Sequence, residues 1–256
     1  MELGLTGKTA LVTGSHRGTG EIIANTLENE GATVIRHGLK DGDLDGATTG
    51  VYGDIATESG CAQVIEQLAA LGQRVDILVN NYGTASPGKW GKTPEGDWLD
   101  MYQKNVLSVA RLCDALVPAM KADGWGRIVN LGTIGSHQPN RIMPHYYAAK
   151  GALATMSVSL TQELSNTGIT VNTVSPGYIR TPELKAGFRL KAEKKGWGSD
   201  WITIERKVVE TEFPNPCGRL ATREEVADLV VFLCSERAAF INGQNIRIDG
   251  GAIRYV

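Results

Sequence analysis

Short apolar runs alternate along this chain with longer segments in which apolar residues recur every three or four positions. Within the short runs the apolar residues are continuous instead of alternating with polar ones, a pattern typical of parallel strands buried on both faces. The longer segments predict helices that cover those faces. The expected strands are residues 9–13, 32–35, 51–55, 75–79, 127–131, 170–174 and 245–248. The expected helices are residues 18–30, 58–71, 98–120, 146–164 and 222–234. The fold class is therefore α/β, with one parallel sheet between two layers of helices.

The chain shows no internal boundary. Its 256 residues fit one sizeable α/β domain better than two small ones. No stretch rich in proline, glycine or serine divides it, so we expect a single domain over residues 1–256. Residues 182–216 are too long for a simple connection, which predicts a substrate lid at about 182–216.

Composition narrows the class of protein. A formal net charge of -2 argues against a general nucleic-acid binder. No apolar run reaches the length of a membrane span, and residues 1–4 lack the pattern of a signal peptide. The four cysteines lie far apart without a C-x-x-C pair, so neither disulfides nor a metal site is expected. We expect a cytoplasmic protein with no membrane, metal or nucleic-acid partner.

The stretch TGSHRGTG, residues 13–20, joins the first expected strand to the first expected helix. The N-terminus of a helix carries unpaired N–H groups and a partial positive charge, which bind phosphate. Glycines let the backbone approach such a ligand closely. The turn is a candidate phosphate site, although many strand-to-helix turns need glycine for their geometry alone.

Further motifs follow this turn in a fixed order. They are Asn80-Asn81-Tyr82-Gly83 after a strand, Asn105 in a helix, Tyr146-x-x-x-Lys150, Pro176-Gly177 after another strand, and Asp249-Gly250-Gly251. Together with T-G-x-x-x-G-x-G, this set resembles the short-chain dehydrogenase/reductase family over residues 5–251. The resemblance implies a Rossmann-type, doubly wound parallel sheet with helices on both faces, and a nicotinamide cofactor.

The resemblance also implies which positions bind that cofactor. They are Gly14, Gly18 and Gly20 along the pyrophosphate, Asp54 at the adenine, Asn81 near the adenosine ribose, and Pro176, Gly177, Ile179 and Thr181 beside the nicotinamide. The motifs supply five further cofactor-binding positions, namely His16, Arg17, Gly83, Tyr146 and Lys150.

Tyr146 and Lys150 are four residues apart, so on a helix they share one face. Reduction of a carbonyl needs a proton donor, and a phenol with a pKa of about 10 is poorly matched to neutral pH. A neighbouring ammonium would lower that pKa. The alternative interpretation of this spacing is an ordinary Tyr/Lys pair on the surface. Tyr147 is a competing phenol, but it lacks the four-residue spacing to Lys150.

Two catalytic positions follow from the resemblance, and two departures from the family pattern accompany them. Asn105 matches the asparagine that supports a water-linked proton path. Thr133 stands where the family usually has a serine that orients the substrate oxygen, and its hydroxyl can still donate and accept. Ser136 is a nearby alternative. Tyr82 replaces the usual alanine, either as core filler or as a residue that reshapes the site.

The choice of cofactor depends on charge near the second strand. NAD-dependent relatives usually carry an acid at the end of that strand, and none stands near Gly38. Arg17 in the glycine turn matches an arginine of NADP-preferring relatives, and a guanidinium binds phosphate well. The other cations expected to add charge are Arg36, His37 and Lys40, while Asp41 and Asp43 remain possible ribose partners. We expect NADP, with NAD as second choice.

These observations predict an oxidoreductase that transfers a hydride between the nicotinamide and a carbonyl or secondary alcohol. The nearest substrate hypothesis is a 3-oxoacyl thioester. An NAD-dependent alcohol or sterol-like dehydrogenase is the alternative enzyme, and a non-catalytic nucleotide sensor is the alternative of another class. The resemblance also implies a homotetramer, assembled through the helices at 98–120 and 146–164 and the C-terminal segment.

Overall fold

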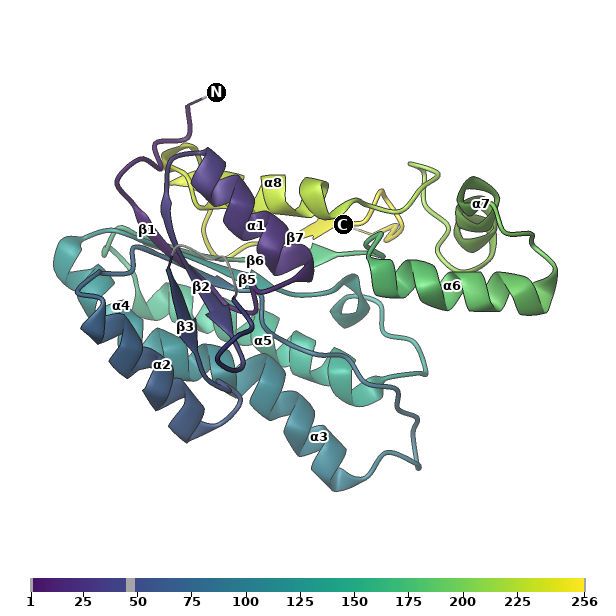
Figure 1. Cartoon of the computed structure of the whole chain (residues 1–256), viewed down its shortest axis with the longest axis horizontal. Helices are drawn as coiled ribbons and strands as arrows, with labels where there is room; N and C mark the ends of the chain where they lie inside the picture. Colours follow the sequence, from purple (N-terminus) through teal and green to yellow (C-terminus); the bar gives the residue numbers. More distant parts are fainter. Residues whose placement is uncertain (1, 45–48, 256) are drawn as a thin grey trace.

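The computed structural model describes residues 2–44 and 49–255, so residues 1 and 256 of the expected domain lie outside the described residues. The strands of the described part are β1 (Thr9–Val12), β2 (Thr33–Gly38), β3 (Gly50–Tyr52), β4 (Ile77–Asn80), β5 (Gly126–Leu131), β6 (Ile169–Pro176) and β7 (Asn245–Ile248). They form one parallel sheet in the order β3-β2-β1-β4-β5-β6-β7 (Figure 1). The order reverses between β1 and β4, which confirms the predicted doubly wound sheet of Rossmann type.

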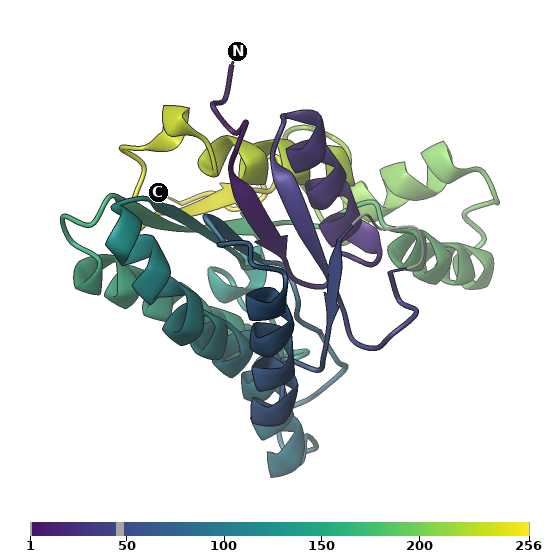
Figure 2. The same ribbon diagram turned by 60° about the vertical axis from the view of Figure 1, so that its left-hand side comes forward.

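Helices cover both faces of this sheet. The helices are α1 (Gly18–Asn29), α2 (Glu58–Ala70), α3 (Glu95–Tyr102), α4 (Ser108–Asp123), α5 (Pro144–Glu163), α6 (Pro182–Lys195), α7 (Trp201–Thr211) and α8 (Arg223–Leu233). In Figure 1, α1 and α8 lie on one face, and α2, α4 and α5 lie on the other. Figure 2 shows the same two layers from another side, with α6 and α7 at one end of the molecule.

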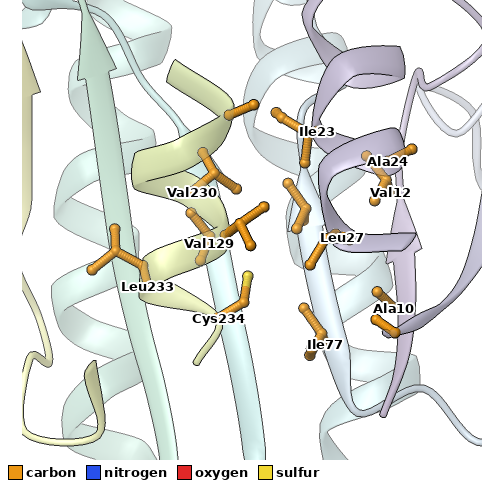
Figure 3. Close-up of a cluster of buried hydrophobic side chains, with 14 of the residues drawn as sticks. Ala10, Val12, Ile23, Ala24, Leu27, Ile77, Val129, Val230, Leu233 and Cys234 are labelled. Carbon is orange, nitrogen blue, oxygen red and sulfur yellow. The ribbon is translucent and has the colours of Figure 1, made fainter. Parts of the chain in front are cut away.

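Successive residues of β1 enter different cores, which explains its continuous apolar run. Ala10 and Val12 belong to the cluster under α1 and α8, where Figure 3 shows them beside Ile23 and Leu27. Leu11 belongs to the second cluster, under α2, α4 and α5. Because side chains alternate between the two faces of a strand, both faces are buried only when every position is apolar.

The helix expected at residues 98–120 differs from the prediction in its bounds and its geometry. It begins at Glu95, ends at Asp123, and contains one π-helical turn, Gln103–Leu107, between α3 and α4. Such a turn inserts an extra residue into a helix and is frequent at functional sites. Its position matters because it contains Asn105.

The expected lid at residues 182–216 contains two helices, α6 and α7, and is therefore not irregular. Side-chain caps start both helices: Thr181 Oγ1 accepts from Leu184 N at 3.2 Å, and Asp200 Oδ2 accepts from Thr203 N at 2.9 Å. Only Ala192 of α6 is buried, so α6 shows no apolar stripe that would predict it. None of the helices described is both long and apolar enough to cross a lipid bilayer.

Candidate active site

The glycine turn lies at the carboxyl ends of β1 and β4, where the strand order reverses. Gly14 and Gly18 have φ angles of 63° and 67°, in the left-handed region that glycine tolerates. A Cβ on Gly20 would run into the Asn81 amide. That amide donates to Thr13 O at 2.9 Å and to Gly14 O at 3.2 Å, so Asn81 braces the turn from the end of β4.

The N-terminus of α1 faces this turn. Its N-cap residue, Arg17, makes no side-chain capping bond, and its side chain is exposed. The turn therefore combines helix N–H groups, glycines that allow close backbone approach, and an exposed guanidinium at the N-cap. This donor set fits a phosphate or pyrophosphate.

Two of the residues expected to add charge are placed differently from the expectation. Arg36 Nη2 donates to Asn25 Oδ1 at 2.6 Å and pairs with Glu28 Oε2 at 2.8 Å, so it is engaged on α1. His37 is fully buried, and burial lowers its pKa to about 4. His37 is thus neutral near pH 7, because desolvation penalises its charged form. In the structure neither side chain is a free cation beside the turn.

The loop after β2 is closed by an acidic residue. Asp43 Oδ2 accepts from Leu39 N at 2.8 Å and from Lys40 N at 3.0 Å. These backbone hydrogen bonds hold the pKa of Asp43 below its usual value. Asp43 thereby fixes the backbone next to Gly38, the place where the sequence lacks an acid.

Tyr82 is both partly packed and polar in its contacts. Its ring packs against the core under α2 and α4, and its hydroxyl donates to Asp54 Oδ1 at 3.1 Å. Burial and the neighbouring Asp54 carboxylate raise the pKa of Tyr82. The two interpretations left open by the sequence therefore combine: Tyr82 fills space and also shapes the edge of the site near β3.

Tyr146 and Lys150 lie one turn apart on α5, near the end of β5. Lys150 is only 5% exposed, its Nζ donates to Leu131 O at 2.6 Å, and burial lowers its pKa to about 8. Burial raises the pKa of Tyr146 to about 12, against an opposing effect from the Thr133 hydroxyl. This direction differs from the expected lowering, because burial dominates and the Lys150 ammonium donates to the Leu131 carbonyl.

Gly83 brings the asparagine and the lysine together. A Cβ on Gly83 would lie 2.6 Å from Asn105 Oδ1 and 3.2 Å from Lys150 Nζ. Asn105 is fully buried, and its amide nitrogen donates to Thr84 O and Met101 O, both at 3.0 Å. Its Oδ1 accepts no hydrogen bond from the residues described. An unpaired buried acceptor beside an ammonium fits the water-linked path that the resemblance implies.

The two candidate hydroxyls after β5 have different surroundings. Ser136 Oγ donates to Thr133 O at 2.7 Å, which closes the short 3₁₀ turn. Thr133 Oγ1 accepts from Gly135 N at 3.2 Å and keeps its own proton to donate. Thr133 lines the adjacent cavity and lies beside the Tyr146 phenol, so the geometry favours it as the orienting hydroxyl.

A cavity of about 300 Å³ opens beside Thr133. Its lining comprises Thr133, Ile134, Gly135, Gln138, Pro139, Asn140, Tyr147, Gly177, Tyr178, Glu212, Phe213, Pro214, Ala252 and Ile253. Pro176 ends β6, next to Gly177, where a Cβ would run into the Phe213 ring. Glu212, Phe213 and Pro214 of this lining come from the lid expected at 182–216, whereas Ala252 and Ile253 come from the C-terminal tail, which no motif indicates as a wall.

The remaining expected positions also lie near these features. His16 is half-buried in the glycine turn, and its Nδ1 has no partner among the residues described. Ile179 pairs with Ala221 in an isolated bridge, just before Thr181 begins α6. Across the residues described, no three His, Cys, Asp or Glu side chains are placed to bind a metal ion.

Comparison with known proteins agrees with this geometry. A family model described as enoyl-(acyl carrier protein) reductase matches residues 14–252. A 3-oxoacyl-(acyl-carrier-protein) reductase of Salmonella typhimurium is 35% identical over 252 residues, which cover 96% of this chain and 97% of the relative.

The chain belongs to the short-chain dehydrogenase/reductase family. Members of this family with solved structures superpose closely. L-Sorbose reductase from Gluconobacter frateurii, complexed with NADPH and L-sorbose, has a TM-score of 0.93 and 32% identity over 100% of both chains. A 3-oxoacyl (acyl-carrier-protein) reductase from Agrobacterium tumefaciens with NADP bound has a TM-score of 0.86 and 31% identity, covering 98% of this chain and 96% of that one. This short-chain dehydrogenase/reductase is an NAD(P)-dependent oxidoreductase acting on a ketone or alcohol, as the sequence predicts.

Proposed function

We propose that this protein reduces a ketone with NADPH, using Tyr146 as the proton donor. The observation that carries the proposal is the arrangement at the cavity mouth. Thr133 and Gly177 line this cavity, and the Tyr146 phenol lies beside Thr133. Gly83 brings Asn105 Oδ1 close to Lys150 Nζ, which lies one turn along α5 from Tyr146.

The nicotinamide supplies the hydride in such a reaction, and this chain's residues supply position and the proton. Thr133 would orient the carbonyl oxygen through its hydroxyl. Tyr146, whose pKa burial raises to about 12, is protonated at neutral pH and can donate a proton to that oxygen. Lys150, with a pKa of about 8, is suited to restore the proton near neutrality, through water held at Asn105 Oδ1.

The cofactor assignment rests on the glycine turn. Gly14, Gly18 and Gly20 would line the pyrophosphate, and Arg17 would pair with the additional phosphate of NADP. Arg36 is engaged on α1 and His37 is neutral, which leaves exposed Arg17 in the turn itself, with exposed Lys40 after β2 as the other expected cation. NADPH and NADP in the two solved relatives support the same choice.

Two substrate classes are consistent with the cavity. The first is a 3-oxoacyl thioester, supported by the curated reductases to which the chain is similar. The second is a small hydroxylated ketone, supported by the polar side chains of Gln138, Asn140 and Glu212 in the cavity and by the likeness to L-sorbose reductase.

The test is NADPH oxidation with acetoacetyl-coenzyme A and with L-sorbose, using Tyr146→Phe as the inactive control. Turnover of either ketone by the parent protein supports reduction, and the ratio of the two values of kcat/KM separates the substrate classes. If NADPH binds but no ketone in a broad panel is turned over, the non-catalytic nucleotide sensor replaces this proposal.

We also propose a cytoplasmic homotetramer. Large apolar side chains are exposed on the helices expected to form the interfaces, namely Leu99, Tyr102, Leu107 and Val158. In the proposed tetramer these side chains are covered by a neighbouring subunit, because contiguous exposed apolar surface marks association sites. Light scattering at micromolar concentration should give four times the monomer mass, and Val158→Arg should lower it; a monomer mass for the parent rejects the tetramer. Fractionation of cells tests the compartment.

A further inference from the structure

Tyr82 spans from the end of β4 to the carboxylate that follows β3. Its backbone N–H donates to Thr13 Oγ1 at 2.9 Å, and a Cβ on Gly14 would lie 3.3 Å from its Cα. Its hydroxyl donates to Asp54 Oδ1 at 3.1 Å. The residue is therefore fixed at both ends, at the glycine turn and at Asp54.

The buried His37 side chain packs against the Tyr82 ring. Its Nδ1 accepts from Gly14 N at 3.0 Å, so its Nε2 carries the proton and donates to Gly53 O at 2.9 Å. The ring lies edge-on to Tyr82, with the centroids 6.2 Å apart and the planes at 88°. A buried neutral imidazole with both nitrogens paired holds the ends of β1, β2 and β3 in one arrangement.

Only one of the two Asp54 carboxylate oxygens accepts hydrogen bonds from the residues described, which leaves the other oxygen open to a ligand. Oδ1 accepts from the Tyr82 hydroxyl and from Ala56 N, the latter at 3.1 Å. Oδ2 accepts no hydrogen bond from the residues described, and the side chain is exposed. An ionised carboxylate oxygen in this state accepts from an N–H donor and repels a carbonyl oxygen.

A nucleotide whose phosphates lie at α1 runs over the ends of the neighbouring strands of the sheet. Here those strands are β2 and β3, and the open Asp54 oxygen lies just beyond β3. The group that meets it is therefore at the base end of the nucleotide.

The family resemblance places Asp54 at the adenine. We propose that Tyr82 is a positioning residue for this contact: its hydroxyl fixes the Asp54 carboxylate so that the open oxygen accepts from the exocyclic amino group of the base. The inference rests on the proposed NADPH-dependent function. It accounts for a tyrosine where the family usually has alanine, since alanine cannot reach Asp54.

The test compares two cofactors that differ only at that group. Dissociation constants are measured by nucleotide fluorescence for NADPH and for its reduced hypoxanthine analogue, in which a carbonyl replaces the amine. In Tyr82→Phe, NADPH should bind about three- to tenfold more weakly while the analogue changes less than about twofold, because only the amine uses the fixed carboxylate. Tyr52→Phe, a change of the same kind on β3, is the control and should leave both constants unaltered.

Equal weakening of both cofactors would show a general structural role and overturn the inference, as would an unchanged ratio. If Tyr82→Phe does not fold, Asp54→Asn takes its place, because its amide can donate to the carbonyl. It should remove the preference for NADPH, and a retained preference overturns the inference. A parent protein that binds NADPH with no preference over the analogue rejects the inference alone, whereas one that binds no NADPH rejects the proposed function with it.

Discussion

The nucleotide end and the lid end of this molecule are held together in different ways. At the nucleotide end, backbone and side-chain hydrogen bonds join β1, β2, β3 and β4 through Thr13, His37, Asn81 and Tyr82. The lid consists of α6 and α7, packed around a small separate core. That core comprises Ala192, Ile204, Val208, Val209, Phe213 and Leu220. A bidentate pair, Arg180 with Glu205, links α7 to the segment between β6 and α6.

This difference separates two tasks. Hydride transfer needs the cofactor and the proton donor in fixed positions, which a network tied into the sheet provides. In our proposal the ketone is recognised by a segment that has its own core, and we expect that segment to tolerate change without disturbing the sheet. Changes at one end should therefore alter one ligand and leave the other unaffected, while changes at the junction should affect turnover alone.

The largest effect is expected at the junction itself, in Tyr146→Phe. Removing a positioned acid typically loses about 10²–10⁴-fold in rate. We expect kcat to fall by this amount while the dissociation constant of NADPH stays within twofold, measured by stopped-flow turnover and by fluorescence titration. Turnover within a few-fold of the parent would show that another group, with Tyr147 the first candidate, donates the proton.

Thr133 is the next residue at the junction. Thr133→Val keeps the shape and removes the orienting hydrogen bond, so kcat/KM should fall by about 10²-fold. Thr133→Ser keeps the hydroxyl and should stay within about tenfold of the parent. The expected order is reversed if Thr133→Val is active and Ser136→Ala is not, an outcome that assigns the hydroxyl to Ser136.

Arg17→Ala tests the nucleotide end alone. A charge-assisted hydrogen bond to phosphate contributes about 1.5–3 kcal/mol, so NADPH should bind about ten- to a hundredfold more weakly. NADH, which lacks that phosphate, should change little, and the KM of the ketone should be unaltered. Arg36→Ala is the matched control, because its guanidinium is engaged on α1. A parent protein that binds NADH more tightly than NADPH contradicts the cofactor assignment.

The smallest effect is expected at the lid end, in Arg180→Ala. This change breaks the pair with Glu205, whose shortest N–O distance is 2.8 Å. The two side chains are 27% and 13% exposed, and losing their pair should loosen the lid locally. The KM of the ketone should therefore rise about two- to fivefold with NADPH binding unchanged. Lys207→Ala, which breaks an exposed pair with Glu210 on α7, serves as the control. An equal loss of NADPH affinity would show that the two ends are not independent.

The sequence predicts the nucleotide end better than the lid end, for physical reasons. Buried parallel strands such as β1 require apolar residues at every position, and this leaves a visible run. The α6 helix buries only Ala192, so no stripe marks it. The direction of a side chain is also invisible: Arg36 and His37 are cations by type, yet one pairs with Glu28 and the other is buried neutral.

The walls of the ketone cavity show the same limit. Ile253 reaches it because the C-terminal tail folds back, with Asp249 Oδ2 accepting from Ile253 N at 2.9 Å and the Tyr255 hydroxyl donating to His137 O at 2.5 Å. The second of these contacts joins residues 118 positions apart in the sequence, and no local pattern encodes it. The expected site residues Thr133, Asn105 and Lys150 were identifiable because they stand at positions that match the ordered motifs of the family.

The π-helical turn at Gln103–Leu107 divides the helix from Glu95 to Asp123 into two α-helical parts, and the side-chain positions of the second part are rotated relative to those of the first. One residue advances an α-helix by about 100°, so every side chain after the turn is rotated by that amount relative to a regular helix. Deleting a single residue there would restore regular winding while turning either Met101 or Val109 out of its core. Loss of one codon in this stretch would therefore be far less tolerable than most substitutions, and homologues of this chain should keep its length and the asparagine while its other residues vary.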